Sequence, residues 1–167
     1  FIITIPFMLQ YNNVISTGEL VTSKNNGWWS VLTGPLLHGS TKHFAGNAVG
    51  LIIGTTLLLN LYKRTYWKVI ILGYLIPPIV MFFTGKSSLG ISGLVFTVIW
   101  FLIFRGLMSM DKSRAIAAIV LLFFFGSTLS SAFPIAFSNV AHQAHMAGLV
   151  TGFFIALYNR LQLSINK

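Results

Sequence analysis

Residues 44–61 read FAGNAVGLIIGTTLLLNL, an apolar run without a charged side chain. A helix needs about 20 mostly apolar residues to cross the hydrocarbon core of a bilayer. Comparable apolar runs recur along the whole chain, which predicts an all-α membrane protein rather than a water-soluble domain.

The composition supports this interpretation. Hydrophobic residues make up 55% of the 167 residues, charged residues only 8%, and the mean hydropathy is +0.81. A soluble domain has about 25% charged residues. The lipid bilayer is therefore the expected environment of most of the surface.

The net charge of +9 does not indicate nucleic-acid binding, because the basic residues lie singly or in short groups between apolar runs. The chain has no cysteine, which excludes disulfides, iron–sulfur clusters and thiolate zinc sites. We expect neither a nucleic-acid partner nor a metal or other cofactor.

The apolar runs predict six helices in one membrane domain that covers residues 1–167. The first run, Phe1–Leu9, is short, and we interpret it as the outer end of a helix truncated at the N-terminus. A longer polar and mixed segment follows. The other five helices are expected at 44–61, 67–83, 92–107, 115–129 or a little beyond, and 144–161.

Basic residues predict the orientation of the bundle. Eight of the eleven lie beside the loops after the second and fourth helices or after the sixth helix: Lys63, Arg64, Lys68, Arg105, Lys112, Arg114, Arg160 and Lys167. Loops rich in lysine and arginine stay in the cytoplasm. The opposite end of the bundle, with the long first loop, is expected to face the outside.

Polar residues that could take part in catalysis gather at that outer end. The four histidines, His38, His43, His142 and His145, all lie near the outer ends of predicted helices, and Ser92 begins the fourth helix. Asn47 follows His43 by four residues, so the two share a helix face. Polar residues within membrane helices are costly and indicate functional sites.

The small polar inventory excludes several kinds of hydrolase. Glu19 and Asp111 are the only acidic residues, and they belong to opposite membrane faces, so no pair of carboxylates can share a site. The H-E-x-x-H motif of zinc proteases is absent. A hydroxyl nucleophile with a histidine base remains, working as a dyad without an acidic third member.

Ser92 lies in the turn Gly90-Ile91-Ser92-Gly93 at a helix start. Unsatisfied N–H groups and the positive end of the helix dipole would favour an oxyanion there. A serine at this position also serves often as a simple helix N-cap, so the motif alone leaves both interpretations open.

His145, Gly148 and Gly152 lie at i, i+3 and i+7 of the last helix, on one face. Small residues in such a stripe allow close helix contact in lipid, which would press His145 against Ser92. The alternative is a packing stripe whose histidine merely lies at the membrane interface.

Together these motifs resemble the rhomboid family of intramembrane serine proteases. Its members carry H-x(4)-H-x(3)-N before and within the second helix, G-x-S-G at the fourth and A-H-x-x-G-x-x-x-G in the sixth. This chain has His38, His43 and Asn47, then Gly90 to Gly93, then Ala144-His145 with Gly148 and Gly152. Trp29 resembles the tryptophan of the family's W-R pair.

The resemblance implies a role for each residue. Ser92 would be the nucleophile and His145 its general base, while His43, Asn47 and the Ser92 N–H would form the oxyanion hole. His38 resembles the family's structural histidine, which forms hydrogen bonds within the first loop. Residues 130–139, with Pro134, would border the substrate entrance.

Two positions depart from the family pattern. Ser30 stands in place of the arginine after Trp29, which removes the arginine's hydrogen bonds from the loop. Phe96 stands where many relatives have a tyrosine, and its ring is expected to stack on His145 without donating a hydrogen bond.

Three other functions remain alternatives: a rhomboid-like protein that binds membrane clients without cleaving them, a haem-binding electron carrier with paired histidines, and a transporter. The resemblance favours cleavage of single-pass transmembrane proteins near the outer face of a bacterial plasma membrane.

Overall fold

The protein is a bundle of α-helices in a computed structural model, which describes residues 3–133 and 142–165. The α-helices are α1 (Thr4–Tyr11), α2 (Ser30–Thr33), α3 (Thr41–Leu61), α4 (Tyr66–Thr84), α5 (Ser92–Leu107), α6 (Lys112–Phe125) and α7 (His142–Ile165). Short 3₁₀ helices are η1 (Lys24–Asn26), η2 (Gly34–Leu36), η3 (Lys63–Thr65) and η4 (Gly126–Ala132).

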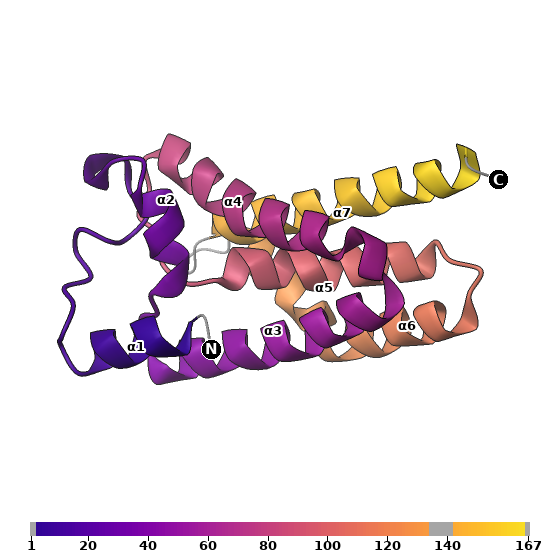
Figure 1. The fold of residues 1–167 in the computed structure, drawn as a ribbon, viewed down its shortest axis with the longest axis horizontal. Helices are drawn as coiled ribbons and strands as arrows, with labels where there is room; N and C mark the ends of the chain where they lie inside the picture. The colour runs from indigo at the N-terminus through magenta and orange to yellow at the C-terminus, as the bar shows by residue number, and fades with distance from the viewer. Residues whose placement is uncertain (1–2, 134–141, 166–167) are drawn as a thin grey trace.

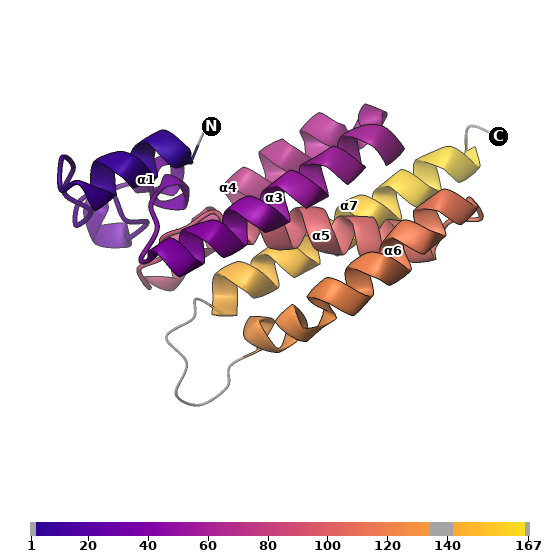
Figure 2. The ribbon, with the colours of Figure 1, turned by 90° about the horizontal axis from the view of Figure 1, so that it is seen from below.

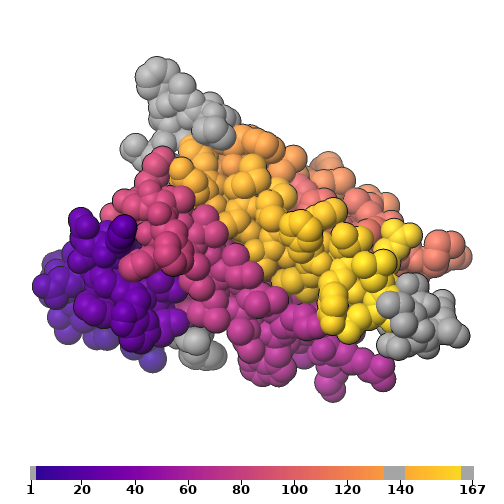
Figure 3. All heavy atoms as spheres, turned by 90° about the horizontal axis from the view of Figure 1, so that it is seen from above, coloured from indigo at the N-terminus to yellow at the C-terminus, as the bar shows by residue number. Residues whose placement is uncertain are grey.

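Helix α5 is the centre of the bundle. It lies between the pair α3 and α6 and the pair α4 and α7, and it contacts all four (Figure 1). Most of its side chains are buried, and Val98 and Phe101 have no exposed surface at all. Figure 3 shows α4 and α7 side by side on one face of the molecule.

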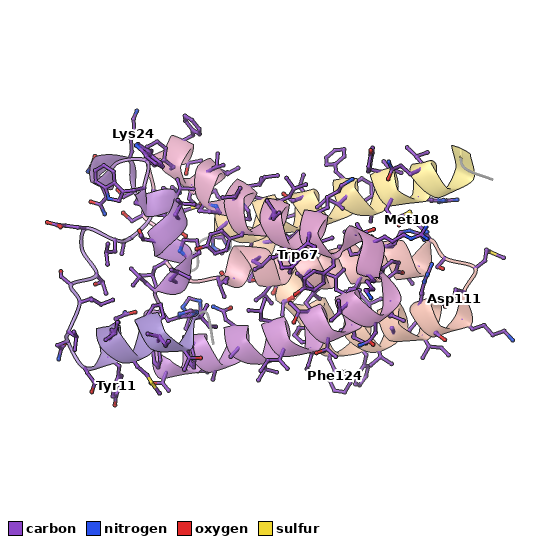
Figure 4. All side chains as sticks on the ribbon, viewed as in Figure 1. Tyr11, Lys24, Trp67, Met108, Asp111 and Phe124 are labelled. Atoms are coloured by element: carbon purple, nitrogen blue, oxygen red, sulfur yellow. The ribbon has the colours of Figure 1, made fainter. Side chains whose placement is uncertain are left out.

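The outer faces of the surrounding helices are apolar. Phe83 is 78% exposed and Phe123 82% exposed, and Phe124 points away from the bundle in Figure 4. Among the described residues, three helical segments are long and apolar enough to cross a membrane: 41–61, 63–84 and 112–132. Apolar surface on such helices is what a lipid environment requires.

Helices α5 and α7 approach each other closely because α7 has glycines at the contact. A Cβ atom on Gly152 would lie 2.7 Å from the Thr97 carbonyl oxygen and 2.9 Å from the Phe101 nitrogen, and one on Gly148 would collide with the Gly93 carbonyl oxygen. Only glycine allows backbone to meet backbone here.

The candidate catalytic residues predicted from the sequence lie at one end of the bundle. The N-terminal ends of α3, α5 and α7 lie together there, next to α1 and α2 (Figures 1 and 2). Lys24 lies at this end of the molecule, whereas Met108 and Asp111 lie at the opposite end (Figure 4). A site made from these three helix starts is therefore geometrically possible.

The predicted helix positions agree with the structure within a few residues, including the fifth, where α6 and η4 together extend to Ala132. The predicted number of six spanning helices is not confirmed. The described residues contain seven α-helices, of which α1 has eight residues and α2 only four. No periodic pattern predicts α2, because so short a helix depends on its tertiary contacts.

Replacing Gly152 with alanine should destabilise the protein. The new methyl group would meet backbone atoms of α5 that cannot move alone, and overpacking of this kind costs about 1–3 kcal/mol. Gly46→Ala is the matched control, since a Cβ atom there meets nothing within 4 Å and alanine favours a helix. Thermal unfolding in detergent, followed by tryptophan fluorescence, should show a lower Tm for Gly152→Ala alone. Equal Tm values for both variants would contradict the close packing.

Candidate active site

Ser92 is the first residue of α5, and its hydroxyl faces another helix. Ile91 occupies the N-cap position, and no side chain caps this helix. The simple N-cap interpretation of Ser92 is therefore wrong. Instead, Ser92 Oγ lies 2.9 Å from His145 Nε2, which is hydrogen-bonding distance.

The imidazole of His145 is held on its face by Phe96. The two rings are stacked, with centroids 4.2 Å apart and planes inclined by 8°. Phe96 lies one helical turn after Ser92, and the stacking that the family resemblance implied for it is confirmed. Phe96 itself is buried, with 8% of its surface exposed, so the ring of His145 rests on a wall of α5.

The second ring nitrogen of His145 contacts η4. Nδ1 lies 3.0 Å from the hydroxyl oxygen of Ser131 and 3.3 Å from its carbonyl oxygen. The same carbonyl lies 2.9 Å from Nδ1 of His142. Ser131 belongs to the segment 130–139 expected at the substrate entrance, but the sequence did not predict its contact with His145, because one serine among several in residues 127–131 carries no distinguishing pattern.

Glycines on both helices set the distance between Ser92 and His145. A Cβ atom on Gly93 would lie 2.5 Å from Cβ of Pro77 in α4, and one on Gly148 would collide with the Gly93 carbonyl. Any larger residue at either position would push α5 away from its neighbours. The contact between Ser92 and His145 thus depends on Gly93, one residue after Ser92, and on Gly148, three residues after His145.

The turn before Ser92 requires a glycine. Gly90 has a φ angle of +101°, a conformation that costs little for glycine alone. Its N–H donates to the Gly34 carbonyl oxygen at 3.0 Å, which ties the turn to the first loop. A Cβ atom here would lie 2.6 Å from Cε1 of His43 and 3.5 Å from Nδ2 of Asn47, so both side chains lie directly beside the turn.

The side-chain amide of Asn47 is a hydrogen-bond donor without a partner among the described residues. Asn47 is buried, with 6% of its surface exposed, and the atom without a partner is Nδ2. Buried amide groups without partners are costly, which makes this atom a candidate for binding an oxygen of a ligand. His43 lies one turn earlier in α3, whose start is capped by Ser40 Oγ accepting from the His43 N–H at 3.1 Å.

These groups line a single cavity of about 560 Å³ between α3, α5, α6, η4 and α7. Its polar residues are His43, Asn47, Ser92, Ser127, Thr128, Ser131 and His145, and its apolar wall includes Val95, Ile99, Trp100, Phe124 and Phe125. Within residues 3–133 and 142–165, no group of three or more His, Cys, Asp or Glu residues could hold a metal ion. The cavity therefore combines a hydroxyl, an imidazole and an unpaired amide beside an apolar surface.

Hydrogen bonds of Ser30 stabilise the first loop. The Ser30 side chain is fully buried and accepts from the Ser23 N–H at 3.1 Å, while the carbonyl oxygens of Gly27 and Ser23 lie at 2.7 and 3.1 Å as acceptors for its hydroxyl. Thr22 Oγ1 also donates to the Ser30 carbonyl at 2.9 Å. The arginine hydrogen bonds expected to be lost at this position are thus replaced by those of Ser30.

His38 lies behind the site rather than in it. Its ring is buried against Phe7 and Phe44, and the His43 ring is 5.3 Å away between centroids. Neither ring nitrogen has a partner in hydrogen-bonding geometry among the described residues, so the ring hydrogen bonds expected of a structural histidine are not found. The backbone is bonded instead: the His38 N–H donates to Gln10 Oε1 at 2.9 Å, and Gln10 Nε2 donates to the His38 carbonyl. Sequence reasoning did not identify Gln10.

Burial lowers the pKa of His38 from 6.5 to about 4, with a further lowering by nearby His43 and a small opposing effect of the Leu36 carbonyl. The neutral ring is therefore the form that the fold favours. Trp29 is not brought to the site, since it is the N-cap residue of α2, is 52% exposed and packs beside Gly27. Of the suggested entrance, residues 134–139 lie outside the described residues.

The comparison with protein families agrees with this arrangement. The family model of the Rhomboid domain matches residues 25–161, which include every residue of the cavity. The chain belongs to the rhomboid family, and it is an integral membrane protein.

Curated relatives are distant. An uncharacterized protein of Mycobacterium tuberculosis is 30% identical over 139 residues, which cover 77% of this chain and 58% of the relative. One of Mycobacterium leprae is 27% identical, covering 77% and 55%. The rhomboid protease GluP of Bacillus subtilis is 26% identical over 155 residues, covering 91% of this chain and 28% of GluP. The chain thus spans little more than half of the mycobacterial proteins.

The lowered pKa of His38 predicts that acid weakens the fold. In the unfolded chain the ring takes up a proton near pH 6.5, whereas in the folded protein it does so only near pH 4. The stability that His38 contributes is therefore present above pH 6.5 and is lost as the pH falls toward 4. His38→Phe, which keeps an aromatic ring among Phe7 and Phe44, should show a smaller drop in Tm between pH 7 and 4.5 than the wild type.

His142→Phe is the control for this measurement, because it also removes one histidine but leaves the buried ring in place. An equal drop in Tm for the wild type and His38→Phe would show that His38 is not held neutral by the fold.

Proposed function

We propose that this protein is an intramembrane serine endopeptidase that cleaves single-pass transmembrane proteins with a Ser92–His145 dyad. The observation that carries the proposal is the 2.9 Å contact between Ser92 Oγ and His145 Nε2 within a cavity formed by membrane helices. A hydroxyl is a weak nucleophile at neutral pH unless an adjacent base takes its proton. The membership of the rhomboid family supports the same chemistry.

In this mechanism Ser92 Oγ attacks the carbonyl carbon of the scissile peptide while His145 Nε2 takes the hydroxyl proton. The tetrahedral intermediate carries a negative oxygen, which needs donors beside it. Three are available: the Ser92 N–H at the start of α5, where helix N–H groups lack intrahelical acceptors, Nδ2 of Asn47, and the His43 ring. His145 then gives its proton to the leaving amine, and water releases the acyl group by the reverse steps.

We infer a transmembrane substrate from the cavity wall. The apolar side chains of Val95, Ile99 and Phe125 suit a lipid-embedded segment better than a soluble peptide. A helical peptide bond is shielded by its own turn, so the segment has to unwind at the cavity. Substrates with glycine or other residues of low helix propensity near the cut are therefore expected to be favoured.

The topology belongs to the same proposal. We propose one membrane domain over residues 1–167 with six membrane helices, of which α1 belongs to the first. Lys63, Arg64, Lys112 and Arg114 mark the end opposite the site, which would face the cytoplasm. The active site would then open toward the outer face, and a bacterial plasma membrane suits this arrangement. Transmembrane proteins and the bilayer are the partners it implies.

The alternative functions fit the geometry less well. A haem carrier would need ring nitrogens free to bind iron, but both ring nitrogens of His145 have partners in Ser92 and Ser131. A protein that only binds clients would have no use for a serine aligned with a base. A transporter would leave the dyad equally unexplained.

Labelling with a fluorophosphonate probe tests the proposed nucleophile. The wild type in detergent should be labelled, and Ser92→Ala and His145→Ala should lose labelling by a factor of about 1,000 or more, because each removes half of the dyad. Ser109→Ala is the control, since its hydroxyl contacts the cytoplasmic loop at Asp111. Labelling that survives Ser92→Ala would contradict the assignment of the nucleophile.

Replacing Asn47 with alanine tests the oxyanion site. Loss of one such donor typically lowers kcat by about a factor of 100 to 1,000. Asn60→Ala is the control in the same helix, where the side chain is exposed and donates only to the Thr56 carbonyl. Cleavage of a transmembrane substrate in liposomes should slow in Asn47→Ala alone. Equal rates in the two variants would remove Asn47 from the mechanism.

A further inference from the structure

A chain of hydrogen bonds continues beyond the dyad, from α7 into η4. It runs from Ser92 Oγ to His145 Nε2 at 2.9 Å, from His145 Nδ1 to Ser131 Oγ at 3.0 Å, and from Ser131 Oγ to the Thr128 carbonyl oxygen at 2.7 Å. We propose that Ser131 is a positioning residue that holds His145 in the tautomer required to accept the Ser92 proton. This inference rests on the proposed protease function.

The donor and acceptor of each hydrogen bond in this chain follow from the bond between Ser131 Oγ and the Thr128 carbonyl oxygen. A carbonyl oxygen can only accept, so the hydroxyl hydrogen of Ser131 is used on Thr128. The same hydroxyl-to-carbonyl bond, three residues back, occurs at Ser130 with Ser127 and at Thr128 with Phe125, so it is a regular feature of η4. Ser131 Oγ is left as an acceptor toward His145.

The imidazole must then carry its hydrogen on Nδ1. Both atoms near Nδ1 accept, namely Ser131 Oγ at 3.0 Å and the Ser131 carbonyl oxygen at 3.3 Å. A neutral imidazole has one N–H and one bare nitrogen. With Nδ1 protonated, the bare Nε2 faces Ser92, which is the arrangement that a general base requires.

Ser131 thereby takes the position of a carboxylate in a three-residue hydrolase site. A carboxylate orients the histidine by accepting from Nδ1–H. This chain has only two acidic residues, and Asp111, at the start of α6, lies at the far end of the bundle (Figure 4). A hydroxyl and a carbonyl give the same orientation without a charge inside the membrane, where a charge is costly.

His142 strengthens the arrangement from the same helix as His145. Its Nδ1 lies 2.9 Å from the Ser131 carbonyl oxygen, so two histidines in the first turn of α7 contact one residue of η4. The alignment of the base thus depends on the position of η4 as well as on the packing of α7 against α5.

The imidazole tautomer can be measured directly by nitrogen-15 NMR of histidine-labelled protein in detergent, with His145→Ala to assign the signal. In the wild type at neutral pH, Nδ1 of His145 should be protonated and Nε2 bare. In Ser131→Ala the two tautomers should mix, and Ser131→Thr should restore the wild-type signal. An unchanged signal in Ser131→Ala would overturn the proposal.

Kinetics provide the second test, with cleavage of a transmembrane substrate in liposomes. Ser131→Ala should lower kcat by about three- to tenfold, the worth of one neutral hydrogen bond, and leave KM unchanged. Ser131→Thr should restore kcat. Ser130→Ala removes the same kind of back-bond from the neighbouring hydroxyl, so an equal loss in this variant would assign the effect to a loosened η4 and overturn the proposal.

The two proposals can fail separately. If the wild type neither labels nor cleaves, the protease function fails, and the tautomer measurement still decides the role of Ser131 because it needs no turnover. If Ser92→Ala and His145→Ala abolish cleavage while Ser131→Ala matches the wild type, the dyad stands and Ser131 has no positioning role.

Discussion

The close approach of α5 and α7 is the constraint on which the rest of the site depends. Where Gly148 faces the Gly93 carbonyl and Gly152 faces the backbone of Thr97, nothing but glycine fits. In lipid no hydrophobic force drives helices together, so this backbone contact and the dispersion forces it allows have to hold the pair. Ser92 and His145 come into contact because α5 and α7 touch at Gly93, one residue after Ser92, and at Gly148, three residues after His145.

The membrane also explains why the chemistry is concentrated at one end. Three helix starts, those of α3, α5 and α7, converge there, and helix starts supply backbone N–H groups that have no intrahelical acceptor. The first loop is tied to the segment before α5 by the Thr22–Ser88 bridge and by the Gly90 N–H, which donates to the Gly34 carbonyl. Only 8% of the residues are charged, and the polar site is made of groups without a formal charge. Each of them either has a hydrogen-bond partner or faces the cavity.

Much of this could be predicted from the sequence, because hydropathy and helix periodicity are local properties. They placed α3, α4, α5 and α6 within a few residues. The stacking of Phe96 on His145 was expected from the resemblance to the family rather than from a local pattern. The roles assigned to Ser92, His145, His43 and Asn47 remain predictions, although the structure brings all four to one cavity.

What the sequence did not reveal depends on contacts between distant residues. Gln10 binds the backbone of His38 across 28 positions, and Ser131, in the 3₁₀ helix η4, contacts His145 across 14 positions. Ser30 was expected to weaken the first loop, yet its small buried hydroxyl makes several short hydrogen bonds there. A serine is too common a residue for any of these roles to be visible before the chain is folded.

The most direct test of the account is to map the covalent adduct of a fluorophosphonate probe by mass spectrometry. Trypsin releases Ser92 in the peptide 87–105, between Lys86 and Arg105, and fragmentation separates it from Ser87 and Ser88. The account predicts an adduct on Ser92 in the folded protein and none after unfolding in hot detergent, because activation depends on His145 being 2.9 Å away. An adduct on another serine, or equal modification of the folded and unfolded protein, would contradict it.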